Sequence, residues 1–297
     1  MPTAPYDFAR TLDYLRTSPA AILERVEGDT YRRAMTIAGQ DVLLILRSVG
    51  TPKKPRLALD VAGSRVDDHI TTATARHIRA IMLLDVDPAP FLATLRGDPV
   101  LAKLVRQFAG LRPTAIASPY EALLWAIIGQ QINVAFAAKL KRSLVDLCGH
   151  SLAIDSTTFG LFPKPATVAA LDPAELRARQ FSQQKTAYIL GVSQAIASGA
   201  LDLAAVPAMS HDEAIAYLTA HKGIGRWTAE YVLMRGMGAQ DSIPAADLGL
   251  RAIIGRAYGL GRNATEIEVR AFAEKWAGWR SWAAFYWWYA LQMKVAM

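Results

Sequence analysis

A change in residue patterning near position 88 constrains the fold of this chain more than any other feature. Before it, the segments "TYRRAMTIAG", "QDVLLILRSVG" and "RLALDVAG" alternate polar with apolar residues or are rich in β-branched ones, which is typical of strands. Residues 7–16 and 19–26 show helical periodicity. After position 88, strand patterns almost vanish and helical segments begin at Pro, Ser or Asp. We therefore expect an α+β fold, with a small antiparallel-sheet domain over residues 1–88 and a mostly α-helical body over residues 89–297.

The composition is that of a globular protein with a basic balance. Of its 297 residues, 52% are hydrophobic and 20% are charged, and the formal net charge is +7. A positive balance favours a polyanionic partner, although many proteins without one are also basic. Cys148 is the only cysteine, which excludes an intramolecular disulfide framework, a cysteine-ligated zinc site and a four-cysteine iron–sulfur cluster.

The first residues of the chain and its hydropathy indicate where in the cell the protein is expected. The segment "MPTAPYDFARTLDYLRTSPA" has no apolar core flanked by basic residues and carries Asp7 and Asp13, so we expect no signal or transit peptide. No run approaches the ~20 apolar residues that a membrane-spanning helix needs. We expect a cytoplasmic monomer with no membrane partner, nucleoid-associated if its source is bacterial.

A Gly-X-Gly turn lies between two helical segments in "DEAIAYLTAHKGIGRWTAEYVLM". Gly223 and Gly225 permit positive φ angles and close backbone approach, while Ile224 between them is expected to enter the core. The amides at the start of the following helix, together with the helix dipole, suit a phosphate oxygen. A tight turn that only joins two helices explains the same residues equally well. The side chains beside the turn that could add charge or hydrogen bonds are Lys222, Arg226 and Thr228.

Asp247 follows "SIPAA" and precedes "LGLRAIIG", so it stands at the start of a helical segment. Aspartate is among the best N-capping residues, and the residues by themselves favour this structural role. A reactive role needs a carboxylate that stays ionised in a mostly apolar cleft. A helix N-terminus helps, because its dipole and amides favour the charged form. The two roles are compatible in one residue.

Aromatic residues gather in two places. Trp227 and Tyr231 are four residues apart and therefore share a helical face just after the turn. The segment "WRSWAAFYWWYALQ" is aromatic around its whole circumference, which is typical of a buried helix. We expect most of its rings in the core. Some are left to line a pocket, where Trp and Tyr faces bind flat or cationic ligands.

The segment "LLWAIIGQQINVAFAAKL" interrupts a buried helix with Gly129, Gln130 and Gln131. A helix–helix contact at the glycine, with solvated glutamines, is one explanation. Alternatively, paired amides at a helix bend could reach base edges or occupy the gap left by an extruded base.

Turn, tryptophan, Gly/Pro-containing loop and aspartate follow one another in an order that resembles the helix-hairpin-helix DNA glycosylases, and most closely the AlkA-type 3-methyladenine DNA glycosylases. The hairpin falls at about residues 211–235, and the resemblance spans nearly the whole chain. Further matching segments are "YDFARTLDYL", "DTYRRAMTIAG", "DPVLAKLV", "IPAADLGLR" and "AEKWAGWRSWAAFYWW". The resemblance implies an enzyme that flips alkylated purines, such as 3-methyladenine, out of double-stranded DNA and hydrolyses the N-glycosidic bond. That reaction would initiate base excision repair.

The resemblance also implies roles for individual residues. Asp247 matches the catalytic aspartate, and Trp227, Tyr231 and Trp288 match aromatic positions of the base pocket. The backbone carbonyls that match a monovalent-cation site, for Na⁺ or K⁺, belong to Thr219, His221 and Gly223, and no cofactor is expected for catalysis itself. The residues implied to contact DNA are Lys222, Gly223, Ile224, Gly225, Arg226, Thr228, Gln131 and Ile132.

Trp227 decides between two mechanisms that the resemblance allows. Bifunctional relatives carry a nucleophilic lysine two residues after the second hairpin glycine, where it forms a Schiff base with the sugar. This chain has Trp227 there, and indole cannot do that chemistry. A monofunctional hydrolase, which leaves an abasic site without cutting the strand, is therefore expected.

Two positions depart from the family pattern. The apolar wedge that fills the vacated base position corresponds to Gln131, with Ile132 next to it, and either could intercalate. A pocket tyrosine directly after the aspartate is replaced by Leu248, which is expected to shift substrate preference.

Two other functions fit parts of this pattern. One is a non-catalytic DNA-binding protein that keeps the hairpin for phosphate contact, although a pure binder does not need a carboxylate that faces DNA. The other is a glycosylase for deaminated or oxidised bases. The missing lysine weakens the oxoguanine version of that function.

Overall fold

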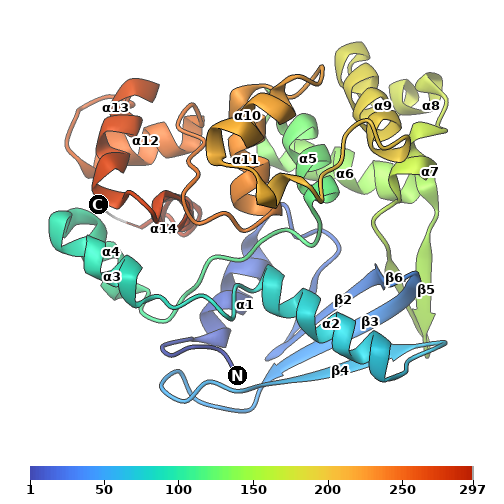
Figure 1. Cartoon of the computed structure of the whole chain (residues 1–297), viewed down its shortest axis with the longest axis horizontal. Coiled ribbons are helices and arrows are strands. Elements are labelled where there is room, and N and C mark those ends of the chain that lie inside the picture. Colours follow the sequence, from blue (N-terminus) through green and yellow to red (C-terminus); the bar gives the residue numbers. More distant parts are fainter. Residues whose placement is uncertain (296–297) are drawn as a thin grey trace.

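The computed structural model describes residues 1–295 and confirms the α+β fold (Figure 1). Its N-terminal part is a four-stranded sheet in the order β1-β2-β3-β4, in which all neighbours are antiparallel. Two helices accompany the sheet. The bounds are α1 (Phe8–Thr17), β1 (Arg25–Glu27), β2 (Thr30–Ile37), β3 (Gln40–Ser48), β4 (Leu57–Gly63) and α2 (Asp68–Ile81).

The prediction of a helix over residues 19–26 is wrong, because this segment is a turn that leads into β1. Its carbonyls are bound by side chains of helix α6 (Val134–Cys148) instead of by its own amides. The Lys141 ammonium donates to the Ala20 carbonyl at 2.7 Å, and Arg142 donates to the Ile22 carbonyl at 2.5 Å. Tertiary contacts therefore override the local helical pattern.

Helices dominate the remainder of the chain, as predicted. Several begin at the Ser, Asp or Pro that the sequence marked, and the side chains of Asp98, Ser118, Ser182 and Ser210 each cap one. The other bounds are α3 (Ala89–Thr94), α4 (Pro99–Gln107), α5 (Pro119–Gly129), α7 (Pro165–Ala169), α8 (Pro173–Ala178), α9 (Gln183–Ala197), α10 (His211–Thr219), α11 (Arg226–Gly236), α12 (Leu248–Ala257), α13 (Glu266–Ala273) and α14 (Arg280–Gln292), with 3₁₀ turns η1 (Leu95–Gly97), η2 (Val206–Ala208) and η3 (Glu274–Trp276).

One element of this region was not predicted. A short hairpin, β5 (Ser151–Ile154) and β6 (Thr157–Gly160), lies against the outer face of the main sheet. Phe159 and Leu161 pack there on Ala34 and Leu43 in a small separate core. Strands of four residues carry too few alternations to stand out from a loop.

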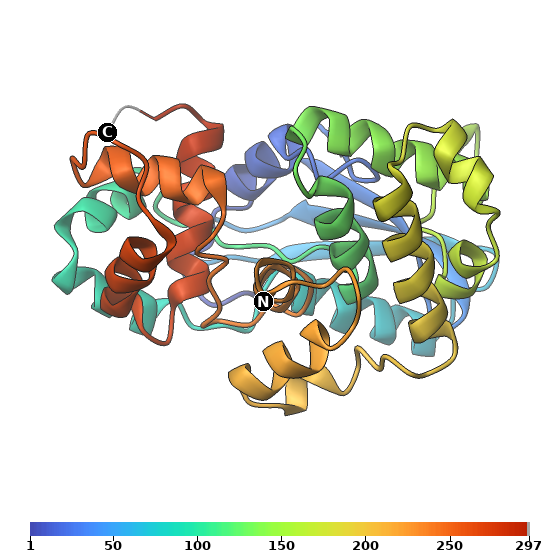
Figure 2. The same ribbon diagram turned by 90° about the horizontal axis from the view of Figure 1, so that it is seen from above.

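The helices form two groups, each with its own apolar core. One core joins the sheet and α1–α4 to α12, α13 and α14, and the other joins α5–α11. Figure 2 shows these groups side by side, with the α10–α11 hairpin near their junction. Trp288 of α14 packs against both cores, so it marks that junction. The first core contains residues from both sides of position 88, and the predicted boundary there stays a prediction.

A buried network of charges ties the sheet to the second group. Arg33 of β2 pairs with Glu24 and with Glu121 of α5, and the Lys141 ammonium lies 2.6 Å from a Glu121 oxygen. The side chains of Arg33, Glu121 and Lys141 are each at most 1% exposed. Burial alone would raise the pKa of Glu121, but Arg33 and Lys141 outweigh it and hold that pKa below its usual value. Among the described residues, no helix is long and apolar enough to cross a membrane.

Candidate active site

The turn between α10 and α11 brings two glycines together for different reasons. Gly223 has a φ of +97°, and a Cβ placed on it would lie 2.6 Å from the Tyr188 ring. Any side chain there would therefore strain the backbone and collide with that ring. Gly225 has an ordinary φ of −86° with open space beside its Cα. Ile224 between them is 4% exposed and enters the second core, as predicted.

Gly225 is the N-cap residue of α11, and no side chain caps this helix. By contrast, side chains cap α10 before it and α12 after it. The first amides of α11 therefore have no side-chain acceptor, at the positive end of an eleven-residue helix. Such an arrangement suits an anion.

Asp247 is the N-cap of α12, which confirms the capping role. Its Oδ1 accepts a hydrogen bond from the Leu250 amide at 2.8 Å and another from the Trp288 indole N–H at 3.0 Å. Within residues 1–295, Oδ2 accepts no hydrogen bond, and the carboxylate forms no ion pair with Lys, Arg or His. The side chain is half-buried. Asp247 is thus oriented by neutral donors while its second oxygen remains free.

The loop over residues 237–246 holds Asp247 in place. The Ser242 hydroxyl donates to the Glu230 carbonyl of α11 at 3.1 Å, and the Ser242 amide donates to the Ser281 hydroxyl of α14 at 2.9 Å. The Asp247 amide then closes a turn onto the Pro244 carbonyl at 2.8 Å. The carboxylate is therefore fixed to both α11 and α14, and not only to its own helix.

Three aromatic rings form a continuous row beside Asp247. Trp227 and Tyr231 lie on one face of α11 with ring centroids 5.5 Å apart, which confirms the prediction from their spacing. Tyr231 and Trp288 follow at 5.8 Å across the junction of the two helix groups. Burial raises the pKa of the Tyr231 hydroxyl, so it stays neutral at physiological pH. The row places uncharged rings next to the carboxylate of Asp247.

The other rings of α14 serve mainly as core. Trp282, Phe285, Tyr286, Trp287 and Tyr289 are each at most 3% exposed, as expected for a helix with no polar face. Of the aromatic residues in α14, Trp288 is the one that is half-buried. Helical periodicity could not single it out, because every face of α14 is apolar.

Comparison with known proteins decides the family. The model described as "HhH-GPD superfamily base excision DNA repair protein" matches residues 124–278, and the AlkA N-terminal domain matches residues 3–118. The chain belongs to the HhH-GPD superfamily. A Bacillus subtilis (strain 168) DNA-3-methyladenine glycosylase is 31% identical over 286 residues, which cover 96% of this chain and 94% of that protein.

Two solved structures resemble this HhH-GPD protein in fold. The 3-methyladenine DNA glycosylase of Archaeoglobus fulgidus superposes with a TM-score of 0.86 at 24% identity, over 100% of this chain and 99% of that chain. Schizosaccharomyces pombe Mag1, a 3-methyladenine DNA glycosylase solved in complex with abasic DNA, superposes with a TM-score of 0.58 at 29% identity. That match covers 70% of this chain and 98% of Mag1.

Within this HhH-GPD fold, the predicted DNA-contact residues differ in exposure. Lys222 and Gly225 are exposed, whereas Thr228 is buried, at 2% exposed. Arg226 is 58% exposed, and its Nε lies 3.0 Å from a carboxylate oxygen of the buried Glu230. Of the positively charged side chains at the hairpin, Lys222 and the outer part of Arg226 are therefore the exposed ones.

The predicted wedge and pocket residues also differ. Gln131 is exposed and adopts a left-handed backbone with a φ of +57°, which is uncommon outside glycine, and Ile132 is half-buried. Leu248 is 73% exposed at the first position of α12, outside the aromatic row. Val134, the first residue of α6, is also exposed, so two large apolar side chains face solvent at the starts of helices α6 and α12.

Gln130 has a structural role that the sequence did not reveal. Its side-chain amide donates to the Gly223 carbonyl and to the Thr228 hydroxyl, both at 3.1 Å. The Lys185 ammonium fixes the same end of α5 by donating to the Ile128 carbonyl at 2.7 Å. Gln130 therefore fastens the loop that carries Gln131 to the hairpin. In the sequence, the side-chain amide of Gln130 in the "GQQ" break was the one feature that could have indicated this role.

The carbonyls predicted to hold a monovalent cation retain free acceptor capacity. Gly223 accepts one hydrogen bond from Gln130, and His221 accepts one from the Ile224 amide at 3.1 Å. Within the described chain, the Thr219 carbonyl accepts none. A carbonyl oxygen has two lone pairs, so each of the three keeps acceptor capacity that a hard cation could use. Residues 1–295 contain no group of three His, Cys, Asp or Glu placed to hold a metal.

Proposed function

We propose that this protein is a monofunctional DNA glycosylase that acts as a monomer at the chromosome, on duplex DNA containing alkylated purines such as 3-methyladenine. The observation that carries the proposal is Asp247, whose carboxylate has a free oxygen and no cationic partner beside the aromatic row. Relatives named DNA-3-methyladenine glycosylase over nearly the whole chain support the same reaction. Mag1 was solved with abasic DNA, which supports DNA as the partner.

The electrostatics of Asp247 suit cleavage of an N-glycosidic bond. As that bond lengthens, positive charge develops on the deoxyribose. A fixed carboxylate stabilises this charge most where water is scarce, and its free oxygen can orient or deprotonate the attacking water. An ion pair with Arg or Lys would cancel the effect, and none is present within residues 1–295.

The aromatic row suits the leaving base. A purine alkylated at N3 is cationic, so it departs without a strong general acid. Ring faces attract such electron-poor bases by stacking and by cation–π interaction. Because stacking discriminates weakly between flat rings, we expect a broad range of alkylated bases.

The hairpin supplies the grip on DNA. We infer that the uncapped amides of α11, with Lys222 and the outer part of Arg226, hold a phosphate near the lesion. A Na⁺ or K⁺ on the carbonyls of Thr219, His221 and Gly223 would add positive charge behind that phosphate and take no part in bond cleavage. Gln131 or Ile132 would fill the space of the extruded base.

The experiment that tests this function is the incubation of the protein with DNA methylated by dimethyl sulfate, followed by identification of the released bases. We expect free N3-methyladenine and N7-methylguanine, and abasic sites in strands that stay uncut. Borohydride should trap no protein–DNA adduct, because Trp227 cannot form a Schiff base. DNA binding without base release would instead indicate a non-catalytic binder, and a trapped adduct would overturn the monofunctional mechanism.

A further inference from the structure

Arg226, at the start of α11, is held by a buried carboxylate. Its Nε donates to Oε1 of Glu230, one helical turn later, at 3.0 Å. Glu230 is 1% exposed, whereas the Arg226 side chain is 58% exposed. Within residues 1–295, the two terminal nitrogens of Arg226 donate no hydrogen bond. The contact therefore uses the inner nitrogen and leaves free the two that bind a phosphate bidentately.

Glu230 is shared with a second arginine, Arg270 of α13. Nη1 of Arg270 lies 2.9 Å from Oε1 of Glu230, and Nη2 donates to Oε2 at 3.3 Å. Nε and Nη2 of Arg270 also donate to a carboxylate oxygen of Glu266, at 3.1 and 2.7 Å. Each nitrogen of the Arg270 guanidinium thus contacts a carboxylate, so Arg270 is poorly suited to bind DNA itself.

The balance of charge explains why this sharing matters. Glu230 carries one negative charge and binds two guanidinium groups, so it does not fully neutralise either of them. Attraction between opposite charges is stronger at a buried carboxylate than in water. Without Arg270, Glu230 would neutralise Arg226 alone and compete with a phosphate for its remaining N–H groups.

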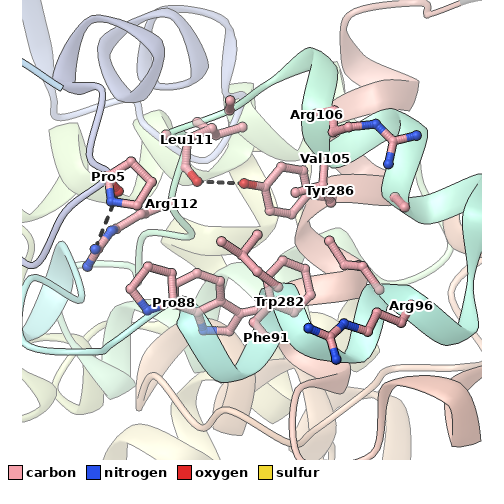
Figure 3. A pocket seen from close by; sticks show the side chains of 15 residues that line it. Pro5, Pro88, Phe91, Arg96, Val105, Arg106, Leu111, Arg112, Trp282 and Tyr286 are labelled. Atoms are coloured by element: carbon pink, nitrogen blue, oxygen red, sulfur yellow. Dashed lines mark hydrogen bonds between the residues drawn. The ribbon is translucent and has the colours of Figure 1, made fainter. Parts of the chain in front are cut away.

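Figure 3 shows two simpler uses of arginine, around the hollow lined by α3, α4 and α14. Arg112 is 1% exposed and donates to main-chain carbonyls, including that of Val86 at 2.8 Å. Arg96 and Arg106 are exposed and, in the described part of the chain, form no ion pair. Arg226 combines the two situations, because it has a buried anchor and an exposed end.

We propose that Arg270 is a positioning residue for DNA binding, which occupies Glu230 and so leaves the end of Arg226 free for a backbone phosphate. This inference rests on the proposed grip of the hairpin on DNA. The catalytic loop is held separately, because the Ser242 hydroxyl donates to the main-chain carbonyl of Glu230 and not to its side chain.

The salt dependence of binding to abasic-site DNA, measured by fluorescence anisotropy with the full chain, tests the proposal. In Arg270→Gln, Glu230 pairs with Arg226 alone. We expect affinity to fall about two- to threefold and the slope of log affinity against log salt to fall by about 0.9, the loss of one phosphate contact. Adding Glu230→Gln restores the total charge and releases Arg226, so the slope should return to the wild-type value. Structural damage would not be repaired by a second buried substitution.

Two further variants localise the effect to Arg226. In the Arg270→Gln background, Arg226→Ala should change the slope no further, because the same contact is already lost. Arg262→Gln removes the exposed partner of Glu268 just before α13 and the same amount of charge, and this matched control should keep the wild-type slope. A wild-type slope in folded Arg270→Gln, or a slope that stays low after Glu230→Gln is added, would overturn the proposal.

Excision kinetics separate this inference from the proposed function. We expect the loss in Arg270→Gln to appear in KM and not in kcat, because binding changes while the Asp247 loop keeps its contacts. A fall in kcat alone would assign Arg270 to the fold of α11 and overturn its positioning role. Failure of the wild type to release any base would instead contradict the proposed function itself, whatever the slopes.

Discussion

Two carboxylates, Glu121 and Asp247, show how differently this fold treats negative charge. Glu121 is 1% exposed and is neutralised by Arg33 and Lys141, which join the sheet to the helical body. Asp247 is half-buried and held only by the neutral N–H groups of Leu250 and Trp288. The first carboxylate therefore stabilises the fold. The second keeps its charge available for a positive partner that the folded chain itself does not supply.

Of the changes that test this contrast, we expect the largest effect from removing the charge of Glu121, and the effect is on the stability of the fold. Glu121→Gln leaves two buried cations without their shared partner, so we expect unfolding free energy to fall by about 3–5 kcal/mol. Urea unfolding measures it. Glu27→Gln removes the exposed partner of Arg32 and is the matched control, with an expected loss of about 0–1 kcal/mol. Similar losses in the two variants would show that burial does not determine how much an ion pair contributes to the unfolding free energy.

The stability contributed by Glu121 should depend on pH. Because Arg33 and Lys141 hold its pKa below the usual value, the unfolded chain takes up this proton at a higher pH than the folded one. The contribution is therefore fully present above about pH 4.3, the value of an unfolded glutamate, and is lost as pH falls through the lower folded pKa. The stability gap between wild type and Glu121→Gln should narrow below about pH 4. A gap that widened there would contradict the ion-pair account.

The next largest effect is on catalysis at Asp247. Asn keeps the helix cap but carries no charge, so Asp247→Asn should lower the rate of 3-methyladenine release by roughly 10²–10³-fold. The same variant should change unfolding free energy by less than about 1 kcal/mol, since Asn and Asp cap helices equally well. Single-turnover excision and urea unfolding give the two values. Near-normal excision would sink the catalytic assignment.

Trp288 tests whether the orientation of that charge matters. Trp288→Phe removes the hydrogen bond to Asp247 Oδ1 but keeps a ring against Tyr231. We expect kcat to fall about tenfold, close to the value of one hydrogen bond to a charged group, with KM little changed. Trp287→Phe, in the core next to it, is the control for loss of packing. A change in KM alone would assign Trp288 to base binding and not to orientation.

The predictable parts of this molecule are those set by local pattern. The capping position of Asp247, the shared face of Trp227 and Tyr231 and the burial of Ile224 each follow from spacings of a few residues. The misassigned helix over residues 19–26 fails for the opposite reason. Its carbonyls are claimed by Lys141 and Arg142, more than a hundred positions away.

The site itself needed more than local pattern. Trp288 was selected only by family resemblance, because its neighbours in α14 are equally aromatic. Glu121 was not recognised, because its partner Arg33 is 88 positions away in the sequence. A lone carboxylate within "PYEALLWAII" was nevertheless a visible signal of a buried ion pair, since unpaired charges are rarely buried.

Gln130 offers a smaller test, of how the hairpin is held. Gln130→Ala removes the hydrogen bonds to the Gly223 carbonyl and the Thr228 hydroxyl. We expect affinity for abasic-site DNA to fall about fivefold, equivalent to about 1 kcal/mol for a partly exposed pair of bonds. Gln131→Ala is a useful comparison, because it removes the adjacent exposed amide and leaves the hairpin bonds intact. If Gln130→Ala bound DNA normally, the hydrogen bonds from Gln130 to the hairpin would not be needed for DNA binding.

We expect the smallest effect from removing Arg226. This residue also brings a third carboxylate, Glu230, into the comparison. Glu230, 1% exposed, is paired with Arg226 and also with Arg270 at 2.9 Å, so it stays neutralised when Arg226 is removed. Arg226→Ala should therefore leave stability nearly unchanged and weaken DNA binding only about two- to threefold. The salt dependence is more telling, because loss of one phosphate contact reduces the slope of log affinity against log salt by about 0.9. Lys53→Ala, exposed on the loop between β3 and β4, should leave the slope as it is. An unchanged slope in Arg226→Ala would mean that this arginine serves Glu230 alone, as Arg33 serves Glu121.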